Sequence, residues 1–143
     1  MDELVRWLGE QLDEDERIVQ EALRYVDADW QRDSGENVVQ ASGATAAGQQ
    51  PVDVTADRWR RPMVDSPAVV AHVAEHDPAR VLREIKAKRQ ILKMAEEATQ
   101  QAESRDYLVN GPAKMMLVCL KPVLLHLATA YADRPGYRGE WRI

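Results

Sequence analysis

The sequence predicts a mainly α-helical protein, a small bundle of about four helices with a short β-hairpin between the first and second helices. Apolar residues recur at spacings of three, four and seven over much of the chain, which is the period of helices that bury one face. Proline follows a capping residue at Ser66-Pro67 and again at Asp77-Pro78, a pairing that marks the first turn of a helix. The 143 residues fit a single domain spanning 1–143.

The first helix is expected over about residues 3–30. Its apolar stripe consists of Leu4, Leu8, Leu12, Val19, Leu23, Val26 and Trp30. The stripe misses one turn at Asp15, so two helices that meet near Leu12-Asp13 are the alternative. We favour one continuous helix because no Gly or Pro interrupts the stripe beyond Glu10.

Residues 33–57 are expected to connect the first two helices. Two short β-branched segments, 37–40 and 52–55, flank a small, polar loop at about 41–51 that contains glycine. This pattern predicts either a β-hairpin with a long flexible loop or an unstructured excursion between helices.

Two further helices begin at the proline pairs. A short helix is expected from Ser66-Pro67 to near His76, and a long one from Asp77-Pro78 to about Ser104. The long helix keeps helical spacing of its apolar residues, so we expect one of its faces to be buried.

The last helix is expected over the most apolar stretch, residues 115–131, after a break at Asn110-Gly111-Pro112. Its length is near that of a membrane span. However, Lys121, Pro122 and His126 lie in its middle, and a central lysine costs about 3 kcal/mol on insertion. We therefore expect no membrane contact. A helix that is apolar on every side is expected either at the centre of the bundle or at the seam of a homodimer.

Composition and charge exclude several classes of protein. The single cysteine, Cys119, excludes an internal disulfide and zinc sites built from several thiolates. The N-terminus is acidic and has no basic segment typical of a secretory signal, so we expect a cytoplasmic protein. The formal net charge is −5, with acids concentrated in 1–16 and bases in 80–93. These two segments should attract each other, within one chain or between two copies.

A metal site is one functional hypothesis. His72 and His76 lie one helical turn apart, as two ligands of a transition metal would. With Glu75 between them they match the His-x-x-Glu-His pattern of inverted zinc peptidases. The hypothesis is a metal-binding module or metal-dependent hydrolase that holds one divalent metal such as zinc, with His126 as a further ligand. Both histidines also fit a structural role, in which one faces the core and the other caps a helix end.

No other catalytic constellation is present in the sequence. There is no glycine-rich phosphate loop, no Gly-x-Ser-x-Gly elbow and no Cys–His dyad. We therefore predict no catalytic residue and no cofactor apart from the metal of that alternative.

The preferred hypothesis is a small accessory protein that acts by protein–protein interaction without catalysis, as a homodimer or with another protein. Trp, Tyr and Arg dominate interface energetics, and these types gather at two places. They are Trp59 with Arg58 and Arg61, and Tyr137 with Trp141 in an extended tail at 133–143. The same aromatic residues could instead complete the core.

Nucleic-acid binding is the third hypothesis. The basic helix carries Arg80, Arg83, Lys86, Arg89 and Lys93, which could follow a phosphate backbone. The acidic total charge disfavours this role, and a basic helix face is also typical of a solvated surface.

Three segments occur in a characteristic order. They are Leu12-Asp13-Glu14-Asp15-Glu16-Arg17-Ile18, then His72 through Arg89, and then Tyr131-Ala132-Asp133-Arg134-Pro135-Gly136-Tyr137 with Trp141. Together they resemble a family of small uncharacterised proteins, a domain of unknown function, from actinobacteria such as Streptomyces and their phages. The resemblance implies a phage or prophage relation and no activity. Many relatives carry extra Cys and His before the Tyr-Ala-Asp segment, where this chain has only Cys119 and His126, so the resemblance weakens the metal hypothesis.

Overall fold

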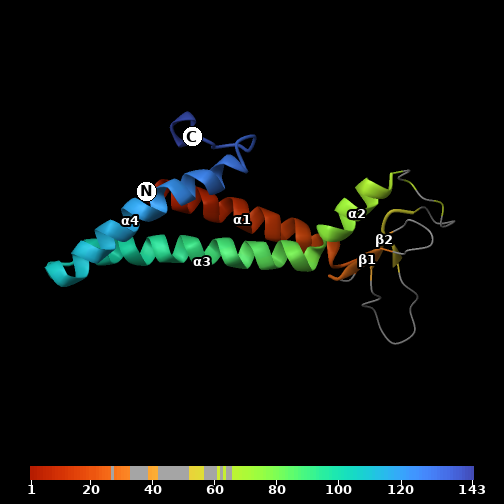
Figure 1. The fold of residues 1–143 in the computed structure, drawn as a ribbon, viewed down its shortest axis with the longest axis horizontal. Coiled ribbons are helices and arrows are strands. Elements are labelled where there is room, and N and C mark those ends of the chain that lie inside the picture. Colours follow the sequence, from red (N-terminus) through yellow and green to blue (C-terminus); the bar gives the residue numbers. More distant parts are fainter. Residues whose placement is uncertain (27, 33–38, 42–51, 57–60, 62, 64–65) are drawn as a thin grey trace. The chain divides into compact units, whose positions relative to one another are not determined.

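The computed structural model describes residues 1–26, 28–32, 39–41, 52–56, 61, 63 and 66–143 (Figure 1). Its helices are α1 (Asp2–Ala22), α2 (Pro67–Glu75), α3 (Pro78–Ala102) and α4 (Tyr107–Thr129). Its strands are β1 (Trp30–Arg32), β2 (Val39–Ala41) and β3 (Val52–Asp53), and a short 3₁₀ helix, η1 (Gly139–Trp141), lies in the tail. The predicted mainly α class with four helices is confirmed. The chain divides into two compact units, residues 1–15 with 85–143 (the first unit) and residues 16–84 (the second unit).

The second unit contains a three-stranded antiparallel sheet in the order β1-β2-β3. Val39 in β2 is fully buried, and its N–H donates to the hydroxyl of Thr55 at 2.9 Å. Helix α2 packs on β1 and β2 and buries Val70. The predicted hairpin is thus present as β2 and β3, and residues 42–51 of its predicted loop lie outside the described residues.

The prediction of a first helix that reaches residue 30 is wrong. Helix α1 ends at Ala22, and Trp30 begins β1, where it pairs with Ala41. Val26 and Trp30 are four residues apart, a spacing that fits the helical period and is also a multiple of the strand period of two. Trp favours strands, and pairing with β2 decides between the two conformations. The alternative of a second helix starting near Asp13 is also wrong, because α1 continues through that position.

The two helix starts predicted from proline are confirmed. Pro67 opens α2 and Pro78 opens α3. The carboxylate of Asp77 accepts a hydrogen bond from the N–H of Arg80 at 2.6 Å, which satisfies one of the free donors at the start of α3. Ser66 precedes α2 in an extended conformation and makes no side-chain cap bond.

Helix α4 begins earlier than predicted. It starts at Tyr107 and runs through Gly111 and Pro112, where the sequence predicted a break before the helix. The cause is the cap: the carboxylate of Asp106 accepts the N–H of Leu108 at 2.9 Å, which stabilises the first turn. Pro112 then costs only one intrahelical hydrogen bond, the one to the carbonyl of Leu108.

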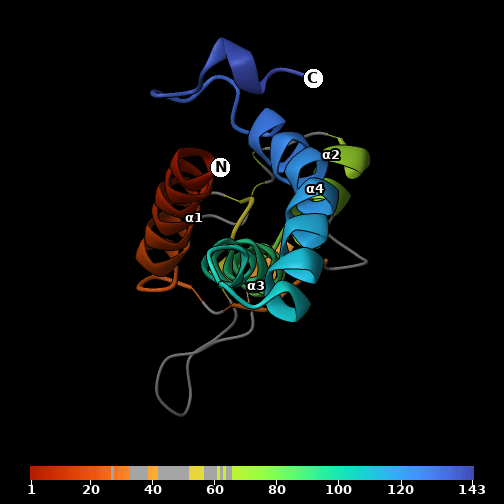
Figure 2. The ribbon, with the colours of Figure 1, turned by 90° about the vertical axis from the view of Figure 1, so that its left-hand side faces the viewer.

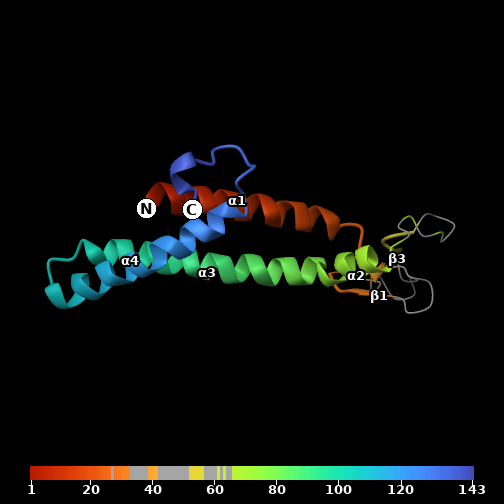
Figure 3. The ribbon, with the colours of Figure 1, turned by 45° about the horizontal axis from the view of Figure 1, so that its top comes forward.

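In the first unit, α1 and α4 lie on different sides of α3 when the molecule is viewed along α3 (Figure 2). The tail after α4 passes over the N-terminal part of α1 (Figure 3). The core of this unit comprises Leu4, Val5, Trp7, Leu8, Leu12, Ile85, Leu92, Ala95, Ala98, Ala113, Leu120, Leu124, Ala128, Tyr131 and Trp141. Every helix of the unit and the tail therefore contribute to one core.

Candidate functional site

The histidine pair lies at the C-terminal end of α2. The ring centroids of His72 and His76 are 4.1 Å apart, and Nδ1 of His76 lies 2.8 Å from the carbonyl of His72. Both side chains are exposed, as is Glu75, while His126 is exposed on α4 in the other unit. Within the part of the chain that the structure describes, no group of three or more His, Cys, Asp or Glu side chains could hold a metal ion.

The predicted basic residues all lie on α3, and several are already paired. Arg80 contacts Glu84 at 3.0 Å, Arg89 contacts Asp13 of α1 at 2.6 Å, and Lys93 lies 3.7 Å from Glu97. Arg83 and Lys86 are exposed. The contact between Arg89 and Asp13 confirms that the acidic and basic segments attract each other within the chain, and such pairing reduces the positive charge that a phosphate backbone would meet.

The predicted aromatic surfaces have different positions. Trp59 and Arg58 lie outside the described residues, and Arg61 is exposed. Trp141 is only 6% exposed, and Tyr137 is half-buried. The tail therefore docks on the bundle, and its two aromatic residues complete the core instead of forming a free surface. The prediction of an extended tail is corrected at η1, where the chain forms a turn of 3₁₀ helix.

Trp7 of α1 is the centre of this docking, and sequence reasoning did not single it out. Its ring centroid lies 6.5 Å from that of Tyr131, 5.8 Å from Tyr137 and 5.0 Å from Trp141. Its indole N–H donates to the carbonyl of Pro135 at 3.1 Å. We call these four aromatic residues the aromatic clasp. The hydroxyl of Tyr137 is buried within it and has no hydrogen-bond partner among the described residues.

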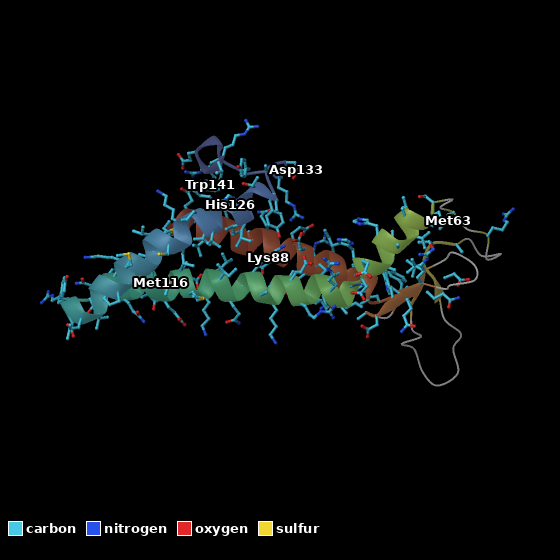
Figure 4. The ribbon with its side chains drawn as sticks, in the orientation of Figure 1. Met63, Lys88, Met116, His126, Asp133 and Trp141 are labelled. Atoms are coloured by element: carbon cyan, nitrogen blue, oxygen red, sulfur yellow. The ribbon has the colours of Figure 1, made fainter. Side chains whose placement is uncertain are left out.

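Ion pairs support the aromatic clasp on both sides. Arg134 pairs with Asp15 of α1, and the Tyr131 hydroxyl donates to the same carboxylate at 2.8 Å. Arg138 pairs with Glu3, and Lys88 of α3 lies 3.4 Å from the Tyr131 hydroxyl (Figure 4). The complementary charges of the acidic first helix and the arginine-bearing tail were visible in the sequence and could have indicated this contact.

Helix α4 is much less buried than its composition predicts. Its buried residues are Ala113, Leu120, Leu124 and Ala128. Leu108 is 82% exposed, Val118 69% and Met115 66%. By length and composition α4 could cross a membrane, and only 17% of that stretch is buried in the protein. The prediction that this helix fills the centre of the bundle is therefore wrong, and the seam of a homodimer remains the other prediction for this helix.

Several exposed apolar residues of α4 lie on one side of the helix. At 3.6 residues per turn, the exposed residues opposite the buried side are Leu108, Met115, Val118, Cys119, Pro122 and His126. We call this surface the α4 face. It contains no Lys, Arg, Asp or Glu, and over its whole length α4 carries no Asp or Glu. Lys114 and Lys121 lie along one edge of the face.

A groove lies along the other edge of the α4 face. It has a volume of about 220 Å³ and is lined on α3 by Met94, Glu97, Ala98 and Gln101 and on α4 by Pro112, Ala113 and Met116. Figure 4 shows Met116 on α4 beside α3. We call this groove between the two helices the α3–α4 groove. The face and the groove together form a continuous, largely apolar surface with one acid, Glu97.

A larger cavity of about 460 Å³ lies beneath the tail, lined by Met1, Glu3, Leu4, Lys121, Leu125, Glu140 and Trp141. Both of its carboxylates contact Arg138, Glu3 directly and Glu140 at 3.6 Å. We therefore assign this cavity to the docking of the tail. The α4 face is the strongest candidate for a functional site.

Comparisons with known proteins give the family of the chain. Neither curated proteins nor solved structures give a match. One family model matches residues 1–143. The chain therefore belongs to the family of unknown function DUF6221, over its whole length.

Proposed function

We propose that the protein acts by binding a protein partner through the α4 face. The observation that supports this proposal is the exposure of Leu108, Met115 and Val118 on a side of a long helix that has no Lys, Arg, Asp or Glu. Contiguous apolar patches of this kind are rare on soluble monomers and mark interaction sites.

The energetics favour burial of this surface. Covering a large aliphatic side chain stabilises an association by about 1.5–3 kcal/mol. Three such side chains together contribute about 4.5–9 kcal/mol, which is comparable to the cost of association of about 4–15 kcal/mol. The face is also carried by a rigid helix, so little conformational freedom is lost on binding.

A membrane is the competing occupant, because α4 is long and apolar enough to span one. Two features favour a protein. Leu120, Leu124 and Ala128 already pack into the first unit, and insertion of α4 would remove those contacts. Lys121 also lies near the middle of the helix, where burial in lipid costs about 3 kcal/mol.

Site-specific photocrosslinking tests the proposal. A photoreactive amino acid placed at Val118 should crosslink to a protein in the cells that naturally produce the chain, and the same group at Glu10, exposed on α1, should not. The Val118 crosslink should be lost with Met115→Glu and kept with Ile18→Glu, which places the same charge at another exposed apolar position.

The identified partner must then bind the purified chain with the same dependence on Met115. Absence of any crosslink from Val118 would overturn the proposal. So would flotation of the purified chain with lipid vesicles that Met115→Glu abolishes, because the face would then bind lipid.

A further inference from the structure

We propose that the occupant of the α4 face is a second copy of this chain, with the two α4 helices side by side and parallel. This inference rests on the proposed function, since it names the partner of the same surface. It follows from the chemistry of the two edges of the face.

The first edge is basic. Lys114 and Lys121 are seven residues apart and therefore on the same side of α4. Both are exposed, and neither makes an ion pair with a residue that the structure describes. A partner that covers the face brings these ammonium groups close to its own surface, where a carboxylate would favour the contact.

The second edge is the α3–α4 groove, which carries Glu97. This carboxylate has one weak neighbour, Lys93 at 3.7 Å, and both side chains of that pair are more than half exposed. Such a pair contributes little, so Glu97 remains available to a second cation. The groove also has apolar walls, Met94 and Met116, over which the stem of a lysine side chain can lie.

The symmetry of a dimer decides which edges meet. In a parallel pair the two-fold axis runs along the helices, so the lysine edge of each copy meets the groove edge of the other. Glu97 lines the groove beside Ala113, at the level of Lys114, so Lys114 would approach Glu97 of the partner subunit. In an antiparallel pair the axis crosses the helices, and the lysine edges of both copies meet and repel.

The size of the surface also fits. The 23 residues of α4 span about 35 Å, and the face with its groove is about two helices wide, roughly 20 Å. The product is close to the share of about 800 Å² per partner in a standard interface. The α4 face and its two edges therefore provide an apolar area, a lysine and a glutamate on one surface. A two-fold dimer requires such a self-complementary surface, because both copies use the same patch.

The native cysteine makes the test direct. Cys119 is exposed on the α4 face. A parallel pair places equivalent residues at the same level, so the two thiols come close together. A short bis-maleimide should convert the purified protein into a covalent dimer of twice 16.2 kDa. Cys119→Ser combined with Glu10→Cys should not form one.

The direction of the helices is tested with a second cysteine position. In the Cys119→Ser background, Leu108→Cys should also crosslink to itself, because equivalent positions face each other in a parallel pair. In an antiparallel pair these thiols would lie about 30 Å apart and would not react, which would overturn the parallel arrangement.

Exchanging the charges of Lys114 and Glu97 tests whether these two edges meet in the dimer. Lys114→Glu and Glu97→Lys should each weaken dimerisation by about two- to five-fold, as expected for an exposed ion pair. The double variant should restore it. A double variant that is weaker than both single variants would overturn the pairing of these edges.

The outcomes separate this inference from the proposed function. The purified chain could stay monomeric and give no Cys119 crosslink while Val118 still crosslinks a different protein in cells. This result would overturn the homodimer and leave the proposed function in place. Failure of both crosslinks overturns both.

Discussion

The indole N–H of Trp7 donates to the carbonyl of Pro135 at 3.1 Å and so joins the first helix to the tail, 128 positions later in the chain. The same indole ring contacts Tyr131, Tyr137 and Trp141. The two ends of the sequence are therefore held together by one side chain, and the tail is part of the core of the first unit.

Replacement of Trp7 should destabilise the protein strongly. Trp7→Ala is expected to lower the free energy of unfolding by about 3–5 kcal/mol, because it leaves a cavity in the aromatic clasp. Urea unfolding followed by circular dichroism measures the change. Tyr25→Ala, at a residue that is 73% exposed, is the control and should change stability by less than about 0.5 kcal/mol. A similar effect of both substitutions would contradict the role of Trp7.

Gly136 should not tolerate a side chain. Its φ of +82° is in the left-handed region, and an added Cβ would lie 2.9 Å from Nε1 of Trp7. Gly136→Ala should therefore cost at least about 1–2 kcal/mol of backbone strain and loosen the contact with Trp7. The matched control is Gly139→Ala, where an added Cβ meets no described atom within 4 Å. Thermal unfolding of the two variants should separate them clearly.

The pair of Asp15 and Arg134 should contribute more to stability than the pair of Asp13 and Arg89. Asp15 is 19% exposed in its side chain and also accepts the Tyr131 hydroxyl, so Asp15→Asn should cost about 1–3 kcal/mol. Asp13→Asn removes the more exposed pair with Arg89 and should cost less than about 1 kcal/mol. Equal losses in chemical denaturation would show that burial does not distinguish the pairs.

Removal of metal should leave the stability unchanged. His72 and His76 offer two imidazoles, whereas a structural zinc ion needs four ligands, and the described residues bring no third ligand to them. The melting temperature should be the same before and after chelation, and the same in His72→Ala. A melting temperature that zinc raises in the native protein but not in His72→Ala would establish a metal site.

Local signals in the sequence predicted the starts of α2 and α3 well. The Asp77 carboxylate accepts a backbone N–H of the first turn of α3, and Pro78 has the φ angle that a helix requires. Both effects are local, so the start of α3 could be predicted without any distant contact. Trp30 was predicted wrongly because its spacing from Val26 fits helix and strand equally, and only the distant partner Ala41 decides.

The candidate site was harder to predict. The apolar composition of α4 was plain in the sequence, but composition does not say which side of a helix meets the core. That side is set by packing of Leu120 and Leu124 in the first unit, and it leaves Met115 and Val118 outside. Trp7 was missed for a related reason, since its partners lie more than a hundred residues away.

Sedimentation velocity of the purified protein over a range of concentrations tests the central claim most directly. We expect a mass of twice 16.2 kDa for the native chain and for Ile18→Glu, and a monomer for Val118→Glu with unchanged helix content. A native chain that sediments as a monomer at every concentration, or a Val118→Glu variant that still forms the dimer, would contradict it.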